Sequence, residues 1–181
     1  LSLLGGLTMA SFAWSGHGAA GEGATGVVQL VADVAHLLAA GLWLGALAGL
    51  GIALARPPPT PPGDRQALVA ALEGFAGIGS ALVATLILTG LVNMWVLVTP
   101  ARLPALVTTA YGLLLLAKLA LFGVMLGCAA LNRFRIMPAL RAAGEAPLGP
   151  LRRSLVLETA CGVAVLALVA WFAMLPPPAA L

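Results

Sequence analysis

Two polar side chains inside an apolar stretch offer the clearest chemistry in this sequence. Asp33 and His36 stand three positions apart, so in a helix they share one face. Imidazole nitrogen binds copper and zinc well, and a nearby carboxylate can orient the ring through its other nitrogen. His17, in a preceding stretch rich in Gly and Ala, could complete a small metal or proton site. The same spacing fits an Asp–His pair that only ties helices together, so both interpretations stay open.

Sulfur-containing side chains bear on the choice of metal. Thioether sulfur favours Cu(I), and Met94 and Met174 are the methionines expected on the same side of the membrane as this pair. Met125, Cys128 and Cys161 form a second soft group toward the other side. They could receive Cu(I), although scattered Met and Cys residues in apolar helices usually serve as packing.

Lys118 is a lone charge near the centre of the apolar run 105–131. A cation at mid-bilayer costs at least ~2.5–3.5 kcal/mol, so the ammonium needs an acidic partner, carbonyl oxygens or a wet cavity. Asp33 and Glu158 are its candidate acidic partners. The remaining polar side chains singled out within the apolar segments are Glu73, Asn93 and Tyr111.

Glu73 and Glu158 lie within about two helical turns of the ends of their segments. Nearby arginines could neutralise them there, and the candidates are Arg65, Arg152 and Arg153. The functional alternative is an exit for a cation on that side of the membrane.

The composition sets the class of protein that must position these groups. The chain is 61% hydrophobic and 8% charged, with a mean hydropathy of +1.07, whereas an average soluble domain carries roughly 25% charge. This predicts an all-α, polytopic membrane protein, because the alternating pattern of an outer-membrane barrel is absent. The net charge of +3 is no sign of nucleic-acid binding. Nucleotide-binding, nucleophile-elbow and zinc-protease motifs are also absent, so we expect no enzyme.

Five apolar segments are expected to be helical: about 1–14, 27–55, 67–98, 105–131 and 154–175. A spanning helix needs ~20 residues, so the last four can cross a membrane and the first is partial. We predict a single transmembrane bundle over 1–181 with four full spanning helices. Because the chain opens on a leucine inside an apolar stretch, we expect it to be a fragment of a longer protein.

The basic residues predict the orientation of this bundle. Loops 56–65 and 132–153 hold seven of the nine Lys and Arg residues, whereas the opposite side holds only Arg102. By the positive-inside rule both loops are cytoplasmic. Asp33, His36, Asn93 and Tyr111 then lie in the outer half of the membrane. The arginines of the two loops are Arg56, Arg65, Arg133, Arg135, Arg141, Arg152 and Arg153.

Five stretches, in order and in register, resemble the copper resistance protein D (CopD) family of bacterial inner-membrane proteins. The resemblance runs from residue 15 to residue 175. The family proteins are longer, which agrees with the expectation of a fragment. The stretches are Asp33-Val-Ala-His36-Leu-Leu-Ala-Ala-Gly-Leu-Trp43-Leu-Gly45, Leu88-Thr-Gly90-Leu-Val-Asn93, Tyr111-Gly-Leu-Leu-Leu-Leu-Ala-Lys118, Leu131-Asn-Arg-Phe-Arg135 with Pro138, and Leu151-Arg-Arg-Ser154 with Glu158.

This resemblance implies movement of copper across the inner membrane, in uptake or resistance, beside a periplasmic CopC-type copper-binding partner. We therefore expect His36, with Asp33 and His17, to form an outward-facing copper site. Two alternatives stay open: a b-type haem protein for electron transfer, which needs two axial histidines, and a membrane scaffold for a periplasmic copper protein. The positions that match the family pattern are His17, Asp33, His36, Asn93, Tyr111, Lys118 and Glu158.

Overall fold

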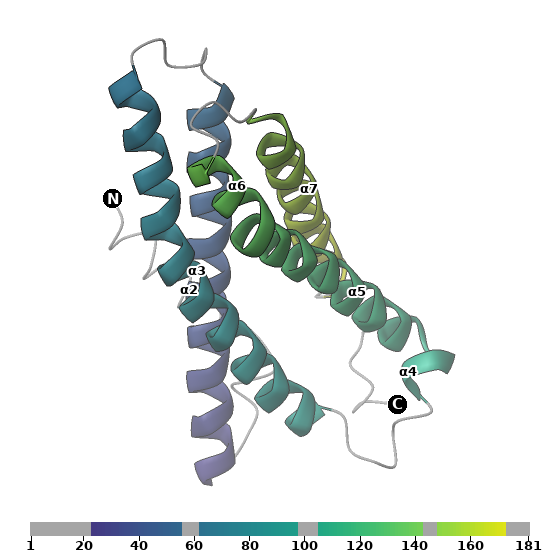
Figure 1. Cartoon of the computed structure of the whole chain (residues 1–181). Helices are drawn as coiled ribbons and strands as arrows, with labels where there is room; N and C mark the ends of the chain where they lie inside the picture. Colours follow the sequence, from purple (N-terminus) through teal and green to yellow (C-terminus); the bar gives the residue numbers. More distant parts are fainter. Residues whose placement is uncertain (1–22, 56–61, 98–104, 143–147, 173–181) are drawn as a thin grey trace. The chain divides into compact units, whose positions relative to one another are not determined.

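The computed structural model describes residues 23–55, 62–97, 105–142 and 148–172. These residues are helical almost throughout and include no strand, which confirms the all-α prediction (Figure 1). The expected helix 1–14, His17 and Met174 lie outside the described residues. The elements are α2 (Gly23–Ala55), α3 (Pro62–Leu97), α4 (Ala105–Thr108), α5 (Ala110–Leu131), a π-helical turn η3 (Asn132–Ile136), α6 (Met137–Ala142) and α7 (Gly149–Phe172).

Four stretches of these helices are long and apolar enough to cross a membrane: Ala24–Leu54, Ala70–Trp95, Ala110–Ala142 and Gly149–Trp171. A helix satisfies its own backbone hydrogen bonds, as any segment in hydrocarbon must. Many large apolar side chains point away from the protein, which suits a lipid environment. The chain is therefore a multi-pass helical membrane protein.

Three helices begin earlier than the apolar pattern predicts: α2 begins at Gly23 where 27 was expected, and the other two begin at or beside a proline. The expected starts were 67 and 154, whereas α3 begins at Pro62 and α7 begins at Gly149 with Pro150 next. Proline has no N–H group, but the first turn of a helix leaves its N–H groups without intrahelical partners. Proline would break the interior of a helix, but it is well tolerated in the first turn.

The expected helix 105–131 is broken near its beginning. Thr109 has extended backbone angles, φ −109° and ψ 151°, and separates the single turn of α4 from α5. Its hydroxyl accepts a hydrogen bond from the Gly112 backbone N–H at 3.1 Å. A threonine that satisfies an N–H group of the first turn is a typical helix N-cap.

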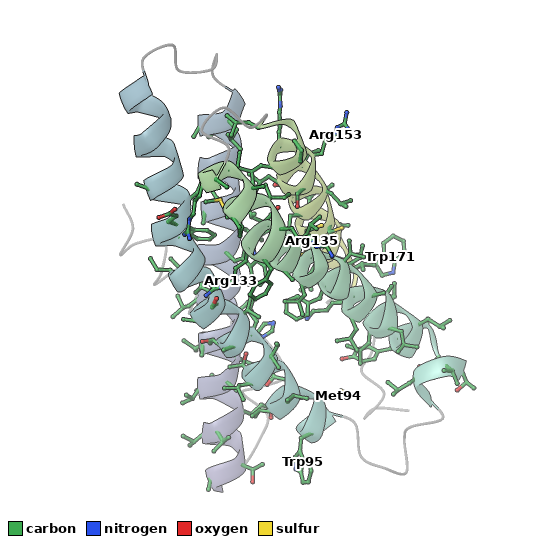
Figure 2. All side chains as sticks on the ribbon, in the orientation of Figure 1. Met94, Trp95, Arg133, Arg135, Arg153 and Trp171 are labelled. Carbon is green, nitrogen blue, oxygen red and sulfur yellow. The ribbon has the colours of Figure 1, made fainter. Side chains whose placement is uncertain are left out.

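The prediction of a polar loop over 132–153 was wrong for its first half, because the helical path continues to Ala142. The continuation passes through η3, where the Met137 N–H bonds to the Asn132 carbonyl. This wider turn brings Pro138 into the first turn of α6, where the missing N–H costs little. Arg133 and Arg135 are thus helical residues that continue directly from α5 (Figure 2).

Contacts divide the chain into two units, each considered by itself. The first comprises Leu1–Gly45 and Gly79–Arg102, of which the described parts belong to α2 and α3. Side-chain hydrogen bonds join its two helical segments, and Trp43 is buried within it. The buried residues of this unit other than glycine are Gln29, Ala32, Ala39, Trp43, Leu82 and Leu86.

The second unit comprises Ala46–Ile78 and Leu103–Leu181. Within it α5 and α7 pack side by side (Figure 1). The core is rich in leucine, and it also contains buried sulfur and polar groups. Its buried apolar residues are Leu47, Leu72, Met125, Cys128, Met137, Leu140, Leu151, Leu155 and Cys161.

Two tryptophans lie near helix ends, as an interfacial aromatic belt predicts. Trp95 is 85% exposed near the end of α3, and Trp171 is 64% exposed near the end of α7 (Figure 2). Trp43 differs, because it is buried within the first unit.

Candidate functional site

His36 and Asp33 lie on the part of α2 that belongs to the first unit, and both are half-buried. The ring nitrogen Nδ1 of His36 lies 2.8 Å from the hydroxyl oxygen of Thr89 on α3. Gly90 borders the same ring, since a Cβ atom placed there would be 3.9 Å from the His36 Cε1 atom. The imidazole is therefore held between α2 and one turn of α3.

The hydrogen bonds of Thr89 fix which nitrogen of His36 carries the proton. The hydroxyl of Thr89 donates to the Thr85 carbonyl, 2.6 Å away in its own helix. A hydroxyl has one proton, so toward the imidazole its oxygen acts as an acceptor. Nδ1 of His36 then carries a proton, and in the neutral form of the ring the lone pair is on Nε2. A neutral imidazole oriented in this way is suited to bind a metal ion through Nε2.

Asp33 is joined to α3 by a second hydrogen bond. The side-chain nitrogen of Asn93 donates to the Asp33 carboxylate at 2.6 Å. On α3, Asn93 stands four residues after Thr89, and on α2, Asp33 stands three residues before His36. The hydrogen bonds Asp33–Asn93 and His36–Thr89 are therefore one helical turn apart and link the two antiparallel helices like successive rungs of a ladder. We call Asp33, His36, Thr89 and Asn93 the α2–α3 polar ladder.

One hydrogen-bond acceptor of the ladder has no partner. The side-chain oxygen of Asn93 is buried and has no hydrogen-bond partner. Buried polar atoms in proteins nearly always have one, and an unpaired acceptor is commonly explained by a water or an ion. A carboxylate, an amide oxygen and an imidazole nitrogen are together chemically able to receive a cation.

The described residues do not by themselves form a complete metal shell. Within the described ranges, no three His, Cys, Asp or Glu side chains are grouped so that they could hold a metal ion. The predicted ligands His17 and Met174 fall outside those ranges. Met94 follows Asn93 directly on α3 and is partly exposed near the end of that helix (Figure 2).

Thr89 is the residue of this ladder that sequence reasoning missed. Asp33 was expected to orient the imidazole, and the structure gives the bond at Nδ1 to Thr89. A signal was available, because Thr89 and Asn93 are polar residues four apart in an apolar segment. Thr89 and Asn93 thus share one face of α3, as Asp33 and His36 share one face of α2.

The other predicted polar residues belong to the second unit. Tyr111 and Lys118 are half-buried on α5, and each has an interaction partner. Glu73 of α3 forms an ion pair with Arg141 of α6, a partner that differs from the arginines proposed from sequence. Both side chains are well exposed, and exposed ion pairs contribute only ~0–1 kcal/mol. Glu73 is therefore a surface residue with a structural contact.

Glu158 is 2% exposed and lies on α7. The side-chain nitrogen of Asn132, in the π-helical turn, donates to its carboxylate at 3.2 Å. The partners proposed from sequence were Lys118 or a nearby arginine, and the structure adds a neutral amide. Glu158 is thus a buried carboxyl group within a packed helix interface, unlike Glu73.

Comparison with known proteins identifies the family of this chain. Residues 69–172, more than half of the sequence, match the family described as Copper resistance protein D (CopD). The chain is 40% identical to "Copper resistance protein D" of Pseudomonas syringae pv. tomato over 182 residues, covering 98% of this chain and 58% of that protein. It is 32% identical to "Copper transport protein CutJ" of Bacillus subtilis (strain 168) over 166 residues, covering 92% of this chain and 28% of that protein.

No solved structure matches the chain. The chain spans a little over half the length of the first relative and under a third of the second. The matched region includes most of α3 and all of α5 and α7, and the longer alignments also include α2 with Asp33 and His36. On the length of the family match, this helical membrane chain belongs to the copper resistance protein D (CopD) family.

Proposed function

We propose that this chain is the part of a bacterial inner-membrane copper transporter that accepts copper at the α2–α3 polar ladder. The observation that carries the proposal is the hydrogen bond between His36 and Thr89, which orients the imidazole between two apolar helices. Membership of the CopD family supports copper as the cargo. Asp33 and Asn93 supply oxygen atoms beside the imidazole and an acceptor that lacks a partner.

The side of the membrane from which copper enters follows from the distribution of the arginines between the loops. With loops 56–65 and 132–153 in the cytoplasm, the ladder lies in the outer half of the membrane and receives copper from the periplasm. A periplasmic CopC-type copper-binding protein or domain is the proposed donor. His17 is the proposed additional ligand from the outer loop, and Met94 and Met174 are further candidates. The protein passes copper on without changing it chemically, so we propose no enzymatic step.

The test is the copper affinity of the purified full-length protein. We expect His36→Ala to weaken copper binding roughly 10–100-fold or more, since loss of an orienting residue alone has an effect of that size. The matched control is Thr85→Ala. It removes a hydroxyl one turn from Thr89 that bonds only to the Ala81 carbonyl of its own helix in the described contacts. The control is expected to bind copper as the wild-type protein does.

Equal affinity in the wild type and His36→Ala would refute the copper site at the ladder. The same preparation tests the haem alternative, because bound b-type haem has an intense Soret absorption band. A Soret band that disappears in His36→Ala would replace copper with haem as the ligand of this histidine. Absence of the band, together with copper bound through His36, supports the proposal.

A further inference from the structure

The exposed side of α7 carries two arginines beside an apolar surface. Arg152 and Arg153 stand near the beginning of this helix, and both side chains are exposed. An open groove of about 380 Å³ is lined by these two arginines together with Val156, Leu157 and Ala160. The groove thus has a positively charged end and an apolar remainder. We call it the α7 groove.

The α7 groove lies on the side of the helix that packing leaves uncovered. Spacings of three and four residues put Val156, Leu157 and Ala160 on the same side as the two arginines. Val156 is 63% exposed and Leu157 is 48% exposed. Glu158, for which these arginines were candidate partners, is buried on the other side of the helix. In a membrane protein, an exposed apolar face of this kind is a surface for lipid chains.

The length of α7 places the two arginines at the edge of the hydrocarbon. The stretch Gly149–Trp171 is apolar and long enough to cross a membrane. Arg152 precedes Trp171 by 19 positions, which is ~29 Å along an α-helix and matches a hydrocarbon core of ~30 Å. With the exposed Trp171 at one interface, the guanidinium groups lie at the other, at the level of the lipid headgroups.

The two arginines add positive charge to a helix end that is already positive. The N–H groups of the first turn give that end a partial positive charge, which favours acidic side chains nearby. α7 has no acidic residue in its first turn. Among the described residues, no carboxylate forms an ion pair with Arg152 or Arg153, and Arg153 extends outward from the helix (Figure 2). This end of α7 is therefore suited to bind an anion.

We infer that the α7 groove binds an anionic phospholipid. The guanidinium groups of Arg152 and Arg153 hold the headgroup phosphate, because their planar forks donate paired hydrogen bonds to phosphate oxygens. An acyl chain of the same lipid lies along Val156, Leu157 and Ala160, where the small alanine side chain leaves room for it. Basic pockets at the membrane edge of transmembrane helices are a known type of site for such headgroups.

The composition of the groove selects this lipid over two related ligands. A choline or ethanolamine headgroup adds a cation that needs an acidic partner, and the lining residues of the groove include none. A free phosphate ion would contact the arginines but would leave the apolar part of the groove unused. The site is also independent of the proposed copper site, because it uses no residue of the α2–α3 polar ladder.

The test measures lipid binding to the full-length protein, stripped of lipid in detergent and titrated with phosphatidylglycerol. Native mass spectrometry gives the affinity for the lipid. We expect Arg152→Gln with Arg153→Gln to weaken it roughly 10–30-fold, the effect of two basic residues at a membrane surface. The matched pair for a single charge is Arg153→Gln, expected to weaken binding about 5-fold, and Arg135→Gln, expected to leave it unchanged. Arg135 is an exposed arginine of the π-helical turn that does not line the groove.

Two further measurements use the wild-type protein and so do not depend on the folding of the variants. Phosphatidylcholine with the same acyl chains is expected to bind at least ~10-fold more weakly than phosphatidylglycerol. Inorganic phosphate at millimolar concentration is expected not to displace phosphatidylglycerol. Equal affinity for the two lipids, or unchanged affinity in the double arginine variant, would overturn the lipid site. Displacement by inorganic phosphate would also overturn it, because the groove would then be a site for the phosphate ion alone.

Discussion

Replacing Thr89 by valine is expected to lower copper affinity roughly 10–100-fold, although valine removes no proposed ligand. Valine has nearly the shape of threonine but lacks the oxygen that accepts the His36 Nδ1 proton at 2.8 Å. Without that acceptor the ring is free to rotate or to change tautomer, and Nε2 is no longer preset for the metal. The measurement is copper affinity of the full-length protein by competition, with thermal unfolding as a check on folding.

Serine at position 89 provides the matched control for this variant. Thr89→Ser keeps the hydroxyl oxygen, so it is expected to keep copper affinity within a few-fold of the wild type. If Thr89→Val and Thr89→Ser behave alike, the hydroxyl does not orient the ring, and the tautomer assigned to His36 loses its support. Reduced affinity in both variants would point instead to the packing of the threonine methyl group.

Changing Asn93 to aspartate is expected to give the largest loss of stability in the ladder. The amide nitrogen of Asn93 now donates to Asp33 at 2.6 Å, and the substitution puts a second carboxylate at that distance. Loss of the donor and repulsion between the carboxylates should cost at least ~1–3 kcal/mol. One of the two groups must then take up a proton to relieve the repulsion.

The reciprocal change at position 33 makes this prediction specific. Asp33→Asn combined with Asn93→Asp restores one donor and one acceptor with their positions exchanged. We therefore expect the double variant to recover most of the stability lost in Asn93→Asp, as measured by unfolding of the purified protein. Free-energy changes that simply add, within ~0.3–0.5 kcal/mol, would mean that these side chains do not interact.

Composition was sufficient to predict the helical membrane fold. Long apolar segments can satisfy their backbone only as helices in lipid, so four spanning helices followed from hydropathy alone. The ends of those helices were harder to predict, because prolines act according to position. Pro62 and Pro150 initiate helices that hydropathy placed later, and Pro138 is tolerated because the π-helical turn precedes it.

The candidate site was predictable only one helix at a time. Spacing put Asp33 and His36 on one face of α2, but it could not say which residue of another helix lies opposite. The register between α2 and α3 depends on packing, which brings Thr89 to His36 and Asn93 to Asp33. The same holds for Asn132 and Glu158, whose contact depends on how α5 and α7 meet.

Copper uptake by sealed proteoliposomes that contain the full-length protein tests whether this protein moves copper across a membrane. We expect time-dependent accumulation of copper with the wild type and with Thr85→Ala, and accumulation near the protein-free background with His36→Ala. Scaffold proteins bind or dock but do not conduct, so flux separates a transporter from that alternative. If the wild-type protein binds copper through His36 but accumulates no more copper than protein-free liposomes do, it is not a copper transporter.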